Sequence, residues 1–117
     1  MKTAAQAYGN VATQTSNPRE LEANLLLDAA SRLQAAKEQE GEGLLNALNH
    51  NRKLWTLLLS AVTSEDNPLD VAIRQNLANL GLFVCKQTLN AQINPDPAKV
   101  APLININRQL AAGLLGR

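Results

Sequence analysis

The spacing of leucine and alanine is the feature that most constrains how this chain can fold. These residues recur at steps of three, four or seven, which places them on one face of a helix with 3.6 residues per turn. No alternating apolar and polar run of strand length is present, so the chain is predicted to be all-α. Four stripes follow one another: Leu21, Leu25, Ala29, Leu33 and Ala36; Leu44, Leu48, Trp55, Leu58 and Val62; Leu69, Ile73, Leu77, Leu80 and Val84; Leu103, Ile106, Leu110 and Leu114.

Three Asn-Pro pairs mark expected helix starts, at 17–18, 67–68 and 94–95. Asn is a favoured N-cap, and Pro is tolerated at the first helical position because its missing N–H has no partner there. At the second pair, Asn67 is expected to cap the helix, and Asp70 in the first turn is favoured by the helix dipole. Together with the stripes, these signals predict three long helices, over 18–38, 43–63 and 68–90.

The two ends of the chain are expected to be less regular. The last helix is predicted to begin at Pro97, capped by Asp96, but Pro102 lacks a backbone N–H, so a kink or a short separate turn is expected. The N-terminal stretch around Tyr8 predicts a short helix that needs docking to hold. The whole of 1–117 is thus predicted to be a single domain, a small antiparallel helical bundle of three long helices, a kinked C-terminal helix and a short N-terminal helix.

Charge and cysteine content limit the partners and the compartment. There are 11 Lys and Arg against 10 Asp and Glu, a formal net charge of +1. The chain therefore has no long-range field to attract nucleic acid or an anionic membrane. A single cysteine, Cys85, cannot form an intramolecular disulfide and fits a reducing compartment. No stretch is apolar enough for a signal peptide or a membrane span, so a cytoplasmic protein without membrane insertion is expected.

No cluster of residues indicates catalysis or a cofactor. His50 is the only histidine and has no Cys or Asp at ligand spacing nearby, whereas zinc normally recruits three or four protein ligands. Cys85 has no candidate base except His50, so a packed, inert thiol is favoured over a nucleophile. We expect no enzyme activity, no metal and no cofactor.

Four further residues are open to two interpretations. Trp55 lies on a core stripe, so packing is favoured over an exposed anchor. Asn51 and Asn107 lie on or beside apolar stripes, where a buried amide must find a hydrogen bond. A network that fixes helix register is favoured for them over a partner contact. Tyr8 could equally pin the N-terminal helix to the bundle or contact a partner.

Five sequence blocks, in this order, resemble the FlaF family of flagellar biosynthesis regulators. Together they cover nearly the whole chain. Each block alone would be a weak signal because helices rich in Leu and Ala are common, but the set is fairly specific. The blocks are AYG at 7–9, NPRELEANLLLDAASRL at 17–33, ALNHNRKLWTLL at 47–58, NPLDVAIRQNLANLGLFV at 67–84 and INRQLAAGLL at 106–115.

The resemblance implies a protein needed for flagellin production or secretion, acting beside a second regulator, FlbT, that restrains flagellin synthesis. The expected partner is flagellin, held as by an export chaperone, with an amphipathic segment in a groove between helices. The alternative is an RNA-binding regulator of flagellin translation, but no aromatic pair, GXXG loop or basic run supports it. The last helix is expected to be the most easily shifted. The candidate partner-binding residues are Tyr8, Arg52, Leu103, Ile106, Asn107, Arg108 and Leu110.

Overall fold

The computed structural model describes residues 18–39 and 41–116, and these residues form four helices and no strand. The predicted all-α helical bundle is therefore confirmed. The N-terminal helix expected around Tyr8, and the cap expected from Asn17, lie outside the described residues. The helices are α2 (Pro18–Ala36), α3 (Glu42–Thr63), α4 (Val71–Ile93) and α5 (Pro97–Leu114).

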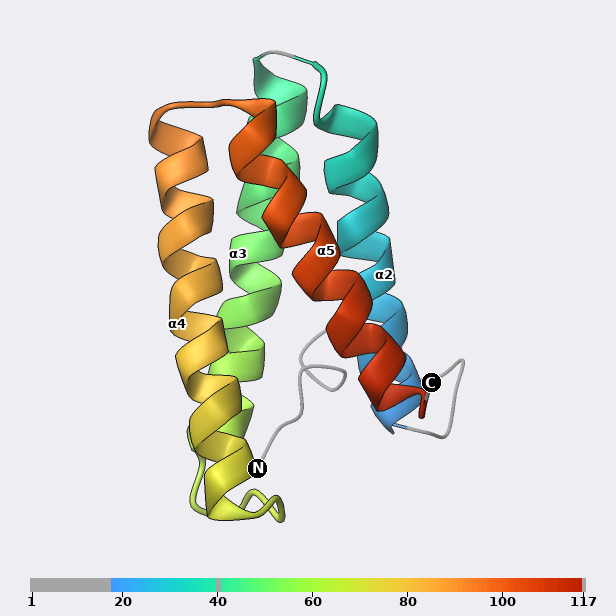
Figure 1. Cartoon of the computed structure of the whole chain (residues 1–117), viewed down its shortest axis with the longest axis vertical. Helices are drawn as coiled ribbons and strands as arrows, with labels where there is room; N and C mark the ends of the chain where they lie inside the picture. The colour runs from blue at the N-terminus through green and yellow to red at the C-terminus, as the bar shows by residue number, and fades with distance from the viewer. Residues whose placement is uncertain (1–17, 40, 117) are drawn as a thin grey trace.

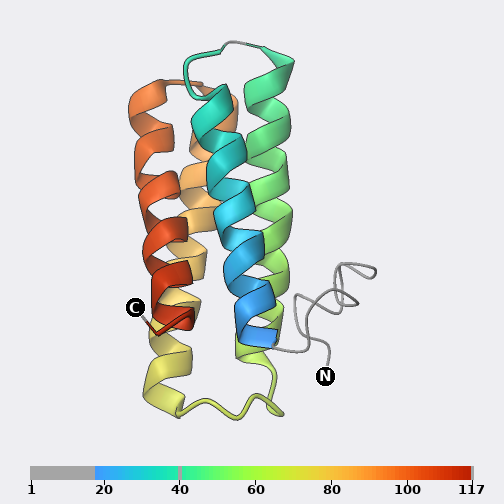
Figure 2. The same ribbon diagram turned by 90° about the vertical axis from the view of Figure 1, so that its right-hand side faces the viewer.

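The four helices run up and down in sequence order, as Figures 1 and 2 show. Their closest packing is between α2 and α5 and between α3 and α4. The bundle is thus two tight pairs side by side: α3 and α4 are consecutive in the chain, whereas α2 and α5 are the first and last of the four described helices. The diagonal partners α3 and α5 have no Cα atoms within 8 Å of each other, nor do α2 and α4. In Figure 1, α4 and α5 are close at the loop that joins them and diverge toward the opposite end.

Helix α2 contributes more buried residues to the core than any other described helix, and it buries an apolar residue in every turn. Burying a leucine stabilises a fold by about 1.5–3 kcal/mol, so this helix concentrates much of the hydrophobic stabilisation. None of its exposed residues is a large hydrophobic. The largest fully buried side chains of the described residues include Trp55, Leu26, Leu33, Leu48, Leu54 and Leu103.

The start of α5 matches its prediction. The backbone N–H of Ala98 donates to Asp96 Oδ1 at 2.9 Å, and Pro97 occupies the first turn. The helix then continues through Pro102 to Leu114, and Figure 1 shows one unbroken ribbon, so the alternative of a separate turn is excluded. Because Pro102 has no N–H, the carbonyl of Ala98 lacks its helical hydrogen-bond donor. Both residues are exposed. Water can therefore take the place of the missing N–H.

The start of α4 differs from its prediction. The helix begins at Val71, not Pro68, and its N-cap is Asp70, which makes no side-chain capping bond. Asn67 Oδ1 instead accepts the N–H of Leu69 at 2.9 Å, and its amide donates to the carbonyl of Ala61 at 3.0 Å. The prediction that Asn67 caps the helix was wrong, because its side chain is used to tie the loop to the end of α3.

Candidate binding cleft

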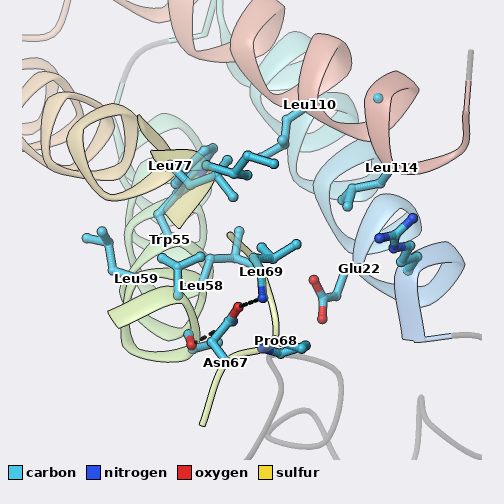
Figure 3. Close-up of a pocket in the computed structure, with 15 residues that line it drawn as sticks. Glu22, Trp55, Leu58, Leu59, Asn67, Pro68, Leu69, Leu77, Leu110 and Leu114 are labelled. Carbon is cyan, nitrogen blue, oxygen red and sulfur yellow. Dashed lines mark hydrogen bonds between the residues drawn. The ribbon is translucent and has the colours of Figure 1, made fainter. Parts of the chain in front are cut away.

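An apolar cleft of about 480 Å³ opens at the end of the bundle where α4 and α5 diverge. All four helices and the loop between α3 and α4 contribute to its walls (Figure 3). Its size falls within the range of about 300–1,000 Å³ that is typical of ligand-binding pockets. The apolar lining includes Trp55, Leu58, Leu59 and Val62 of α3, Leu69 of the loop, Ile73 and Leu77 of α4, and Leu110 and Leu114 of α5.

Several leucines of the cleft are only half-buried although they belong to the core stripes of their helices. Leu58, Leu110 and Leu114 pack against the buried core on one side and line the cleft on the other. Ile73, on the α4 wall, is exposed. Because α4 and α5 separate here, none of the four described helices covers these side chains completely. The cleft therefore presents apolar surface that a partner could bury.

A hydrogen-bond network lies behind the cleft and joins the diagonal helices α3 and α5. The indole N–H of Trp55 donates to Asn107 Oδ1 at 2.8 Å, and the Asn107 amide donates to Asn51 Oδ1 at 2.7 Å. All three side chains are buried. The predicted internal network and the packed role of Trp55 are thus confirmed. Because buried polar groups are costly when unpaired, the network fixes the register of α5 against α3 and holds the Trp55 ring in the cleft wall.

The polar groups of the cleft lie at its rim. Glu22 and Arg19 come from the first turns of α2, and Asn67 comes from the loop (Figure 3). Burial raises the pKa of the Glu22 carboxyl, and the positive charge of Arg19 opposes this shift in part. Glu22 is the only acidic side chain among the lining residues, so it is the group best placed to meet a donor or a cation on a bound segment.

Gly81 explains how closely α4 approaches α3 beside the cleft. A Cβ atom at this position would lie 2.5 Å from Leu59 Cδ2, a distance that real Cβ contacts do not show. Leu59 packs over the bare backbone of Gly81 and also lines the cleft. The glycine, which weakens the helical pattern of the sequence, is thus needed for the packing of α3 on α4.

Of the candidate partner-binding residues that the structure describes, only Leu110 lines the cleft. Leu103 and Asn107 are fully buried, and Ile106 is half-buried against the core. These positions form the contact of α5 with the rest of the bundle.

The remaining candidates lie elsewhere. Arg52 and Arg108 are both exposed, and Arg52 donates to Asn49 Oδ1 at 2.9 Å beside a shallow depression formed with Lys53, Thr56 and Leu57. Tyr8 lies outside the described residues.

Sequence reasoning missed most of the cleft. Leu58, Leu77 and Leu114 were placed on core stripes, which is correct for helix faces but does not reveal that the stripe ends are left uncovered. The sequence pattern does not single out Glu22. The sequence does show that the apolar stripes extend to the ends of the helices. The separation of α4 and α5 at those ends, however, depends on tertiary packing.

The two residues weighed for chemistry, Cys85 and His50, both have shifted pKa values. Burial raises the pKa of the half-buried Cys85 thiol, and this outweighs the opposing hydrogen bond from Thr56 and charge of Arg52. The thiol therefore stays protonated at neutral pH, when it is a poor nucleophile. Burial and Arg32 lower the pKa of His50, while Asp28 at 3.7 Å opposes this.

In the part of the chain that the structure describes, no three His, Cys, Asp or Glu side chains come together in a way that could hold a metal ion. No described helix is long and apolar enough to cross a membrane.

Comparison with known proteins gives one result. A family model described as flagellar protein FlaF matches residues 4–114, which is nearly the whole chain and includes every residue of the cleft. No match was found among curated proteins or among solved structures.

Proposed function

Because the chain belongs to the FlaF family of flagellar proteins, we propose that it binds flagellin as an export chaperone or adaptor and so promotes flagellin synthesis and secretion. The observation that carries this proposal is the apolar cleft, whose leucines belong to core stripes and yet remain half-exposed. On this proposal the protein acts in the cytoplasm, before flagellin is exported, and beside a second regulator, FlbT.

The shape and chemistry of the cleft suit one face of an amphipathic helix. Such a helix docks into a groove through apolar side chains at i, i+3 or i+4, and i+7. Leu58 and Leu77 supply apolar surface on one side of the cleft, and Leu110 and Leu114 on the other. A flagellin segment held there would have its apolar face removed from water and from other flagellin molecules, which is what an export chaperone must achieve.

The charge distribution favours a protein partner over RNA. The net charge is +1, and the cleft lining contains one base, Arg19, and one acid, Glu22. Binding should therefore be driven by apolar burial and should respond weakly to salt. An RNA complex that used several phosphate contacts would instead lose about a thousandfold in affinity between 50 and 200 mM salt.

The proposal is tested by titrating purified monomeric flagellin into the wild-type protein and into Leu114→Asp. This substitution puts a charge on the cleft wall at the last residue of α5, where the side chain is half-exposed and the fold should tolerate it. Affinity should fall at least tenfold. The matched control is Asn105→Asp, on the exposed face of α5, which should bind as tightly as wild type.

Circular dichroism of both variants establishes that the helices are retained, and the wild-type titration is repeated at 50 and 200 mM salt. A folded Leu114→Asp protein with unchanged affinity for flagellin would exclude the cleft as the binding site. Binding of RNA with steep salt dependence, and no binding of flagellin, would replace the chaperone by the RNA-binding regulator.

A further inference from the structure

The cleft leaves apolar side chains partly uncovered on both of its walls. Leu58 and Leu114 pack against the core on one side and are only half-buried. Leu69 of the loop and Leu77 of α4 are half-buried as well. Covering such side chains is favourable, because burial of apolar surface contributes about 25 cal/mol per Å². An apolar segment that is held close to the cleft is therefore expected to dock there.

The chain enters the bundle at the rim of this cleft. Arg19 and Glu22, in the first turns of α2, line the cleft (Figure 3). Residues 1–17, which lie outside the described residues, therefore join the bundle beside the cleft, at Pro18. Tyr8 is ten residues from Pro18, and ten extended residues span up to about 33 Å. Because the bundle measures 40 × 30 × 25 Å, this length is enough for Tyr8 to reach the cleft.

The composition of this segment suits packing better than solvation. No charged residue occurs from Thr3 to Asn17, although charged residues make up 18% of the whole chain. Segments that stay in solvent are typically rich in charge and poor in aromatic residues. This one contains Tyr8, the single tyrosine of the chain, together with Val11 and four alanines. It can therefore enter an apolar cleft without removing a charge from water.

The apolar side chains of the segment also have the spacing of a helix face. Ala4, Tyr8, Val11 and Ala12 are separated by four, three and one residues, which places them on one side of the short helix that the sequence predicts. At about 1.5 Å per residue, this face is about 12 Å long. A helix of this length is not stable alone in water, so it depends on docking against an apolar surface.

The rim of the cleft provides an acceptor for the tyrosine hydroxyl. A buried tyrosine normally keeps a hydrogen-bond partner for its O–H while its ring packs against apolar groups. Glu22 is the only acidic side chain among the lining residues, and Figure 3 shows it at the edge of the leucine cluster. A ring placed against Leu58 and Leu114 can thus direct its hydroxyl to the Glu22 carboxylate.

We propose that residues 4–12 of this same chain occupy the cleft in the free protein, with the Tyr8 ring against the cleft leucines and its hydroxyl donating to Glu22. Because the segment is tethered at Pro18, its effective concentration at the cleft is on the order of millimolar, so a weak contact is enough to fill it. The segment belongs to the region that the family model matches, residues 4–114. A partner that binds in the cleft must displace it.

NMR of the free protein tests the self-docking without any partner. Labelling tyrosine gives a single ring, that of Tyr8, whose contacts are then unambiguous. Nuclear Overhauser contacts should join this ring to methyl groups of Leu58, Leu77 or Leu114, and not to Leu44 at the opposite end of α3. Tyr8→Asp should shift the cleft methyl signals. The control Asn10→Asp, which adds the same charge on the other side of the segment, should leave them in place.

Absence of every contact between the Tyr8 ring and the cleft methyl groups, with the cleft signals unmoved in Tyr8→Asp, would overturn the self-docking. Circular dichroism of both variants should show the helix content of wild type, because neither position belongs to the four described helices.

Titration with purified monomeric flagellin tests the competition, a consequence that rests on the proposed function. Tyr8→Asp should bind flagellin about threefold more tightly than wild type, or better, because apparent affinity rises with the fraction of open clefts. Asn10→Asp should bind like wild type. Weaker binding by Tyr8→Asp would overturn the competition and assign Tyr8 to the flagellin contact. If no variant binds flagellin while the contacts of Tyr8 with the cleft are observed, the proposed function fails and the self-docking stands.

Discussion

Helices α2 and α4 are similar in length but differ in which of their apolar side chains are buried. In α2 all the leucines are largely or partly buried, and the exposed positions carry mostly polar side chains. In α4 the inner face buries small residues, and the larger ones, such as Leu82 and Ile93, are exposed. The comparison shows that the α2 side supplies a large part of the buried core, and the α4 side leaves large apolar side chains exposed.

The largest expected change in stability comes from comparing a buried leucine of α2 with an exposed leucine of α4. Leu26 of α2 is fully buried, so Leu26→Ala should lower the free energy of unfolding by about 2–5 kcal/mol, through lost burial and the cavity left behind. Leu82→Ala on α4 removes the same atoms from an exposed site. It should change the free energy of unfolding by no more than about 0.5 kcal/mol. Urea denaturation at low micromolar concentration measures both. Similar losses for the two variants would contradict the comparison.

The next largest loss of stability is expected from the hydrogen-bond network between α3 and α5, which is one of the contacts between the two helix pairs. Asn107→Ala would leave the Trp55 indole N–H and Asn51 Oδ1 buried without partners. The free energy of unfolding should fall by about 2–4 kcal/mol, since each orphaned group costs about 1–3 kcal/mol. Asn105→Ala, exposed on the same helix, is the matched control and should stay within about 0.5 kcal/mol. An Asn107→Ala protein as stable as this control would mean that the network does not fix α5.

A smaller effect is expected at the loop that leads into α4. Asn67→Ala removes the hydrogen bonds to Leu69 and Ala61, in a part-buried site, and should cost about 1 kcal/mol. Asp70→Ala should cost less, because Asp70 makes no side-chain capping bond although it is the N-cap. Thermal unfolding followed by circular dichroism compares the two. If Asp70→Ala were the more damaging variant, α4 would depend on its cap and not on the loop anchor.

The smallest effect tests the one acidic group of the cleft. Because burial raises the pKa of Glu22 in the folded state, the folded chain binds a proton more readily than the unfolded chain does. Stability should therefore fall as pH rises from the unfolded pKa through the folded pKa. Glu22→Gln removes this dependence, so the variant should be slightly more stable than wild type at neutral pH and equal to it in acid, in urea denaturation across pH. A variant that is less stable at neutral pH would show that the attraction to Arg19 outweighs the burial.

The sequence predicted the helices well because their signals are local. The stripes and caps place α3 within one residue of its observed bounds and α5 at its observed start. The start of α4 was predicted wrongly because Asn67 hydrogen-bonds to Ala61 at the end of α3. The local capping pattern around Asn67 does not reveal this contact. The predicted stripe of this helix is on its inner face, where Val84 is buried and Leu77 and Leu80 are half-buried.

The cleft could not be predicted for a related reason. The pattern assigns Leu77 and Leu114 to core-facing stripes, and the structure confirms the faces. Whether a stripe is covered along its full length depends on the angle between helices, and here α4 and α5 separate before their far ends. Local periodicity contains no information about this angle.

The most direct test of the account is to follow the leucine methyl groups by NMR as unlabelled flagellin is added to the labelled protein. The spectrum reports on the core, the cleft and the outer face of α4 at once. The account predicts that the largest shifts or broadening occur at cleft leucines, Leu58, Leu77 and Leu114, with little change at the core residue Leu26 or at Leu82. Changes concentrated at Leu82 and Leu89, with the cleft signals unmoved, would contradict the assignment of flagellin to the cleft.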